Sequence, residues 1–458
     1  MKPLKVFNVL SLIALLLSTG LNAQEFLVKN INILTLDDTS VKKDHHIHVK
    51  DGKIIGIYAQ NALPGHLREV RQIDGQGQYA FPGLAEMHSH IPITETEDFS
   101  YIEDVMWLYL ANGILNVRGM IGHASHLELK RKIEKGEITA PRIFAAGPSL
   151  NGSTVESPEM GVKMVLEHHQ SGYDHLKLHP GLDMPRFLAI ANTAKEVDIK
   201  FGGHVSLDIG LENSLKHGYH SVEHIDGYIE ALIADKSRLD PQIAGPFSML
   251  LVKEADLDKL PELVQMTLDT KAWIAPTLTL FERFFGYIPA DEFRLEEEMK
   301  YMPGIQVQQW VNQKKLLENQ GVLKAENVKP YLEFRQLLLK TLYDAGVPIL
   351  LSSDSPQVFN VPGFSIHNEI KSMHEAGLTP LDILHAGSRN VAQYFNQDGE
   401  FGIIAKGASA DFVLLSGNPL DDLNQLKNVQ GVMLRGNWIE KEKLQAELNR
   451  IEKKNVRK

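Results

Sequence analysis

The sequence predicts an α/β fold, a (β/α)8 TIM barrel with a small β-sandwich domain formed from both ends of the chain. Over residues 81–395, short apolar runs alternate with longer amphipathic stretches of helical period. β-rich segments with turn residues between them flank this region, at 24–80 and at 396–445. The 458 residues leave room for a barrel of roughly 250 residues and an accessory domain.

The first 23 residues have the features of a cleavable signal peptide. Lys2 and Lys5 form a basic start, an apolar run follows from Val9 to Leu17, and small residues lead to Ala23. The run is shorter than the roughly 20 apolar residues of a membrane-spanning helix. We therefore expect an exported protein, periplasmic or secreted, with no membrane span once the signal is removed.

The two flanking segments predict the strands of the β-sandwich domain. In the first, Asp51-Gly52 lies between apolar runs and is typical of a hairpin turn. In the second, the runs at 410–415 and 431–436 have the same character. Residues 446–458 are rich in charge and are expected to form a C-terminal tail.

The middle of the chain predicts eight barrel strands separated by helices. Amphipathic periodicity indicates helices at 101–111, 127–135 and 185–196, and residues 278–343 resemble inserted helices. The expected strands begin at Ala80, Ile114, Arg142, His175, Lys200, Ser221, Trp273 and Pro348.

The composition narrows the possible chemistry. The net charge is −11, from 47 Lys+Arg against 58 Asp+Glu, which argues against a nucleic-acid partner. The absence of cysteine excludes disulfides, thiolate metal sites and a cysteine nucleophile. The chain has 19 histidines, so imidazole is the side chain most available for metal binding or catalysis.

The strongest local motif is the pair His88 and His90. Alternate residues of a strand project to the same face, so the two imidazoles lie side by side, as two ligands of one metal would. The pair ends a strand that follows Pro82-Gly83, which places it at the mouth of the barrel, where active sites of this fold lie.

Further polar residues end other predicted strands. Each has an ordinary explanation when taken alone: a hydrogen-bonded histidine, a lysine whose amine reaches solvent, or an aspartate that caps a helix. Their order on strands four, five, six and eight, together with the pair on strand one, favours a common site. These residues are Lys177, His204, His224 and Asp354.

Several motifs are spread over residues 26–445: Asp74-Gly75-Gln76-Gly77, Pro82-Gly83-Leu84, the histidine pair, Ser221-Val222-Glu223-His224, Ser352-Ser353-Asp354 and the segments 384–392 and 401–411. On these motifs the chain resembles the amidohydrolase superfamily over nearly all of residues 26–445, and it is most similar to the imidazolonepropionase-related, prolidase-like group of binuclear metal hydrolases.

The resemblance implies two divalent metal ions. His88, His90 and Asp354 would bind the first and His204 and His224 the second, with Lys177 carbamylated (N6-carboxylysine) as the bridge. A buried lysine loses its charge readily, and its neutral amine can take up CO2. A ligand set without thiolate suits Zn²⁺ and would also accept Mn²⁺, Co²⁺ or Fe²⁺.

The implied activity is hydrolysis of a C–N bond, amide or peptide-like, in a small molecule by metal-activated hydroxide. Two metals can polarise the carbonyl and stabilise the oxyanion, and Asp354 would move the proton to the leaving amine. Lactone or phosphoester hydrolysis at the same site stays open. The loop at 147–156 lacks the histidine found there in many prolidase-like members, which weakens a dipeptidase assignment.

Three residues are candidates for substrate contact. His179 shares a strand face with Lys177, Tyr228 follows strand six, and Arg118 closes strand two, where it would bind a substrate carboxylate or pair with a buried acid. A non-catalytic exported binding protein is the other class of function, and the intact Asp354 argues against it. A homo-oligomer stays open.

Overall fold

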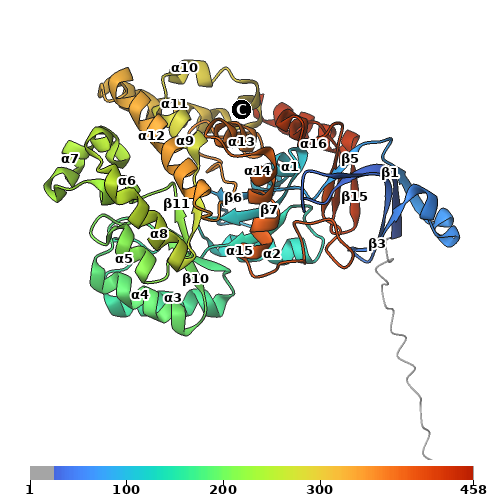
Figure 1. Cartoon of the computed structure of the whole chain (residues 1–458), viewed down its shortest axis with the longest axis horizontal. Coiled ribbons are helices and arrows are strands. Elements are labelled where there is room, and N and C mark those ends of the chain that lie inside the picture. The colour runs from blue at the N-terminus through green and yellow to red at the C-terminus, as the bar shows by residue number, and fades with distance from the viewer. Residues whose placement is uncertain (1–24, 457–458) are drawn as a thin grey trace, which may run out of the picture.

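The computed structural model describes residues 25–456, and the predicted signal peptide lies outside this range. A sheet built from both ends of the chain lies at one side, and an α/β region of alternating strands and helices fills the rest (Figure 1). No helix within residues 25–456 combines the length and the apolar composition that a membrane crossing requires.

The terminal sheet contains eight strands in the order β15-β14-β13-β5-β1-β2-β3, with β4 paired to β1. Ala80 in β5 pairs with Ile33 on one side and with Leu414 on the other, so the two ends of the chain are joined in one ladder. The strand pairing of the described residues gives one mixed sheet, and the β-sandwich stays a prediction. The strands are β1 (Glu25–Leu34), β2 (Val41–Lys50), β3 (Lys53–Ala59), β4 (Arg71–Asp74), β5 (Tyr79–Phe81), β13 (Phe412–Leu415), β14 (Val429–Leu434) and β15 (Asn437–Glu440).

The middle region is a TIM-barrel-like α/β fold. Its strands form two parallel sheets, β6-β7-β8 and β12-β11-β10-β9. Isolated parallel bridges join Ala146 to His175, Ile274 to Ile349 and Ser89 to Ser355. The strands are β6 (Leu84–Ser89), β7 (Ile114–Gly119), β8 (Arg142–Ala145), β9 (His175–Leu178), β10 (Lys200–Gly203), β11 (Ser221–Glu223) and β12 (Trp273–Ala275).

Six of the eight strand starts predicted from the sequence coincide with the structure, and two differ. Ala80 belongs to the terminal sheet, and the first barrel strand begins only at Leu84, because Pro82 lacks a backbone N–H and Gly83 takes a left-handed φ of 81°. The segment from Pro348 makes only isolated bridges. At Asp354 the backbone takes a left-handed φ of 61°.

Helices follow the strands, as the periodicity predicts, and local capping fixes their ends. The Ser157 hydroxyl accepts from the Met160 backbone N–H with Pro158 at the first helical position, and Asp183 accepts from Arg186 in the same way. The α-helices up to β12 are α1 (Ser100–Ala111), α2 (Ala124–Glu134), α3 (Pro158–Ser171), α4 (Met184–Glu196), α5 (Gly210–Lys216), α6 (Tyr228–Leu232), α7 (Pro241–Ala244) and α8 (Leu260–Thr270).

The stretch predicted as inserted helices is helical, and further helices complete the fold. The insertion forms α9 (Leu278–Phe285), α10 (Ala290–Phe293), α11 (Gly304–Asn319) and α12 (Ala325–Asp344). It is followed by α13 (Ser365–Glu375), α14 (Pro380–Ala386), α15 (Arg389–Tyr394) and α16 (Lys441–Val456).

The segment expected to be a charged tail is instead the packed helix α16. Asp104 of α1 is buried and accepts ion pairs from Arg450 (2.8 Å) and Lys454 (2.6 Å). Ile451, which lies between these two residues in the sequence, is fully buried. The helix therefore uses its charges to dock on α1, and residues 446–456, predicted as part of a charged tail, are helical.

Candidate metal centre

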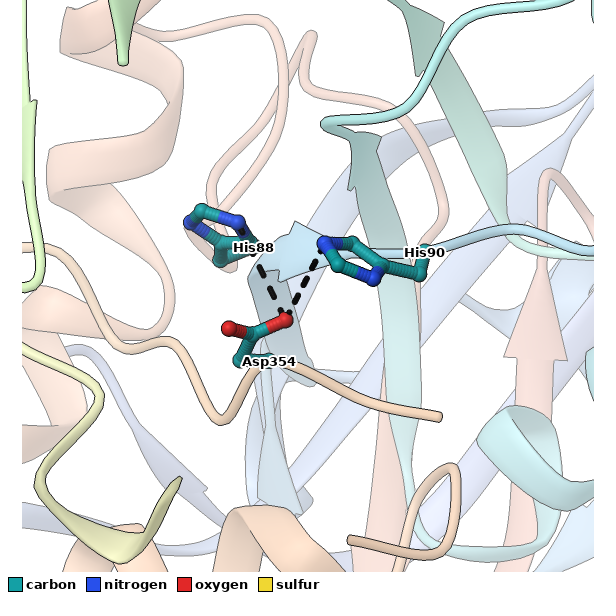
Figure 2. A group of neighbouring side chains, drawn as sticks. All are labelled: His88, His90 and Asp354. Carbon is teal, nitrogen blue, oxygen red and sulfur yellow. Dashed lines mark ion pairs between the residues drawn. The ribbon is translucent and has the colours of Figure 1, made fainter. Parts of the chain in front are cut away.

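His88 and His90 converge on one carboxylate oxygen. Both project from the end of β6, as the alternation of a strand predicts, and they meet Asp354 from the segment on the other side of β6 (Figure 2). The distances from their Nε2 atoms to Oδ1 of Asp354 are 3.9 Å and 3.2 Å. Ligand atoms of all three residues lie within 4.8 Å of one another.

The donor set of these three residues fits a divalent cation. Oδ1 of Asp354 is buried and accepts no hydrogen bond from the described residues. A buried carboxylate oxygen without a partner is costly, and a cation at this position would satisfy it. Two imidazoles and a carboxylate are ligands that zinc and related metals accept.

Lys177, His204 and His224 lie beside this group at the ends of β9, β10 and β11. Nζ of Lys177 is 3.5 Å from Nε2 of His88. The rings of His204 and His224 are stacked with centroids 4.6 Å apart, and the His224 ring is also 4.6 Å from that of His88. The structure thus brings together all six residues that were predicted to hold metal.

Outer partners set the orientation of three imidazoles. The Nδ1 atoms of His88, His204 and His224 make hydrogen bonds of 2.6–2.7 Å to Glu223, Asp226 and Thr277 in turn. The carboxylates of Glu223 and Asp226, when ionised, can only accept a hydrogen bond. His88 and His204 then carry their proton on Nδ1, and their Nε2 atoms are free to bind a metal ion.

Arg118 is buried beneath the site and pairs with a buried acid, which was one of its two predicted roles, and the other role, binding a substrate carboxylate, is corrected. Its side chain is fully buried and makes a bidentate pair with Glu223 at 2.8 and 2.9 Å. The remaining donors reach the Met87 carbonyl, Ser221 and Tyr394. All five N–H groups of the guanidinium are therefore used, and Arg118 acts by holding the acid that orients His88.

A second buried acid, Glu86, joins β6 to the segment that carries Asp354. Its carboxylate accepts from the backbone N–H groups of His88 (3.0 Å) and Ser353 (2.8 Å) and from the Ser353 hydroxyl. Burial raises the pKa of Glu86 to about 7. These contacts fix the two strand ends on which His88 and Asp354 stand.

Burial shifts the protonation of the ligand residues. It lowers the pKa of Lys177 to about 8 and that of His90 to about 3, and it raises the pKa of Asp354 to about 8. Neutral imidazoles are the form that binds metal, and a neutral amine is the form that reacts with CO2. A bound cation would offset the cost of ionising Asp354.

The two other candidates for substrate contact differ in position. Tyr228 is buried, and its hydroxyl is 2.6 Å from Oγ1 of Thr267, within the packing of α6 against α8, which corrects its predicted role at the pocket. His179 is partly exposed, with its ring 5.2 Å from that of His204. Only His179 of the three candidates therefore lies beside the ligands with exposed surface.

The sequence reasoning gave no role to the residues that support the ligands. The role of Glu223 could have been predicted, because an acidic residue in a short buried strand needs a hydrogen-bonding or charged partner. Glu86 carried the same signal, in β6. Asp226 and Thr277 stand in loops and carried none.

Comparisons with known proteins find sequences similar to this chain. The sequence model of the amidohydrolase family matches residues 79–439. An imidazolonepropionase of Kosmotoga olearia is 36% identical over 67 residues, which are 15% of this chain and 15% of that relative's length.

Solved structures share the fold at low sequence identity. A bottromycin amidohydrolase has a TM-score of 0.71 at 18% identity, with 93% of this chain and 91% of that chain covered. A Xaa-Pro dipeptidase with bound methionine has a TM-score of 0.66 at 17% identity, covering 91% and 100%. A prolidase complexed with N-methylphosphonate-L-proline has a TM-score of 0.65 at 18% identity, covering 91% and 99%.

Proposed function

Because the chain belongs to the amidohydrolase family, we propose that it is a metal-dependent hydrolase that cleaves a C–N bond, amide or peptide-like, in a small molecule. The observation that carries this proposal is the convergence of His88 and His90 on the buried Oδ1 of Asp354, which accepts no hydrogen bond from the described residues. Such a set of residues is costly to bury without a cation.

We further propose a binuclear centre in which Lys177 carries a carbamate. His88, His90 and Asp354 would hold the first ion and His204 and His224 the second. The support is the position of the Lys177 amine, fully buried and 3.5 Å from Nε2 of His88. The imidazole and carboxylate ligands suit Zn²⁺ in both positions and would also accept Mn²⁺, Co²⁺ or Fe²⁺.

Divalent ions bound here would supply Lewis-acid polarisation of the scissile carbonyl and activation of water. The residues of the chain supply the proton transfers and the orientation. Asp354 accepts a proton from the attacking water and returns it to the leaving amine. Glu223 and Asp226 keep the Nε2 atoms of His88 and His204 free of protons.

The finer features of the fold and the cellular location are proposals of the same kind. The bridges at both ends of the two parallel sheets support a closed eight-stranded barrel, and the terminal sheet supports a domain that curls into a sandwich. The basic and apolar leader at residues 1–23 supports export. N-terminal sequencing of the protein from the periplasmic or secreted fraction would test export.

The experiment that tests the function combines metal analysis with a substrate screen. We expect about two divalent ions per chain and turnover of N-acyl amino acids or dipeptides. Lactones and phosphotriesters form the comparison arms, because the same residues could serve those reactions. A metal-loaded protein that cleaves only lactones or phosphotriesters would overturn the C–N assignment, and a protein without bound metal would overturn the proposed site.

A further inference from the structure

The loop after β8 places a hydrogen-bonded chain of polar residues against His179 at the mouth of the site. Nδ2 of Asn151 is 3.2 Å from Oγ of Ser149, and this oxygen is 2.7 Å from Nδ1 of His179. The backbone N–H of His179 donates to the Leu150 carbonyl at 2.9 Å, and within the described residues the imidazole ring makes no hydrogen bond other than the one to Ser149. The second ring nitrogen, Nε2, is therefore free of protein partners.

The amide orientation of Asn151 indicates which group donates in each of these two hydrogen bonds. Its Oδ1 accepts from the backbone N–H groups of Ser153 (2.7 Å) and Thr154 (2.9 Å), so its Nδ2 is the side that faces Ser149 and donates to it. The Ser149 hydroxyl then has a hydrogen whose available acceptor is Nδ1 of His179. With the Ser149 hydroxyl donating to Nδ1, the single proton of the neutral imidazole is on Nε2, and we adopt this tautomer.

The position of His179 places its ring beside the predicted metal ligands. The residue stands two positions after Lys177 at the end of β9, and its ring lies 5.2 Å from that of His204. The Thr154 hydroxyl donates to the Ser149 carbonyl at 2.7 Å and so connects the two ends of this loop. His204 and His90, with side chains 18% and 19% exposed, mark the side from which a substrate can reach the ligands.

We propose that His179 is a catalytic residue whose Nε2–H donates to the carbonyl oxygen of the substrate as it becomes an oxyanion, with Ser149 and Asn151 fixing the tautomer. The inference rests on the proposed function. It goes beyond that proposal because it adds a hydrogen-bond donor from the protein, the Nε2–H of His179, to the groups that stabilise the oxyanion. A donor fixed before the reaction costs no reorganisation when the negative charge develops.

The test compares four variants with the wild type on one amide substrate, with metal content measured for each. His179→Phe removes the donor, His179→Gln keeps an N–H at similar reach, Ser149→Ala frees the tautomer, and the exposed His169→Phe is the matched control. We expect kcat to fall by about 10²–10³-fold in His179→Phe with little change in KM. His179→Gln should recover part of this loss, Ser149→Ala should lose less than His179→Phe, and His169→Phe should lose nothing.

A binding measurement separates this inference from the proposed function. A phosphonate with tetrahedral phosphorus at the position of the scissile carbonyl should lose affinity for His179→Phe by about the same factor as kcat, whereas the product carboxylate should not. If the wild type cleaves no amide, the proposed function fails and the phosphonate comparison alone decides. Unchanged kcat or unchanged phosphonate affinity in His179→Phe, or a parallel loss of metal, would overturn the inference.

Discussion

The burial of Lys177 gives a quantitative prediction for the formation of its carbamate. Burial lowers the pKa of this amine from 10.5 to about 8. At pH 7 the neutral fraction is then about 0.09, against about 0.0003 for an ordinary lysine, an advantage of about 300-fold in the reactive form. At a fixed concentration of dissolved CO2, we expect carbamate formation to rise about tenfold per pH unit up to pH 7 and to level off above pH 8.

The assay uses metal-free protein, ¹³C-labelled bicarbonate and the ¹³C signal of the carbamate, followed by zinc addition and activity. Lys177→Ala should give no protected signal. Lys200→Gln is the matched control. Burial also lowers the pKa of Lys200 to about 8, but its amine contacts the Tyr394 carbonyl and none of the predicted ligands. This variant should therefore keep the protected signal of Lys177. A rate that keeps rising through pH 10, or full zinc loading in CO2-free buffer without labelled carbon, would refute the reasoning.

Three further predictions concern other residues of the site. His88→Ala and His90→Ala should each lose at least one of about two metal ions, measured by elemental analysis, and unchanged content in both would contradict the ligand assignment. Asp354→Asn should lower kcat by about 10²–10⁴-fold, more for an amide than for a lactone, with most metal retained; an active, fully loaded variant would show that another group moves the proton. Arg118→Met should lower the free energy of unfolding in urea by about 3–5 kcal/mol, because it leaves Glu223 buried without its cation. The double variant Arg118→Met with Glu223→Leu should recover part of that loss, and an equal loss in both would show that the pair is not the cause.

Much of the fold could be predicted because local patterns determine it. The strands that begin at Ile114, Arg142, His175 and Ser221 are short apolar runs, and the structure begins them at these residues. The helix α16 also carried a local signal, since Leu444 and Ile451 are seven residues apart on one face and are both buried. The high charge of this segment led to the prediction of a tail in place of a helix.

The site could be predicted only in part, because its supporting contacts join distant parts of the chain. The pair His88 and His90 follows from the alternation of one strand. By contrast, Glu223 lies 135 positions from His88 and 105 from Arg118. No local pattern tells whether Arg118 meets a substrate carboxylate or a buried acid, so its partner became known only from the structure.

The position of β5 between β1 and β13 bears on how the chain folds and whether it can be divided. β13 begins 331 positions after β5 ends (412 − 81 = 331). Until those last residues have been synthesised, one edge of β5 presents unpaired backbone groups, which are a template for aggregation. A fragment ending at residue 395 would contain every predicted ligand and would still expose this edge. The hydrolytic region is therefore not separable from the final segment of the chain, and attempts to express it alone should yield insoluble protein.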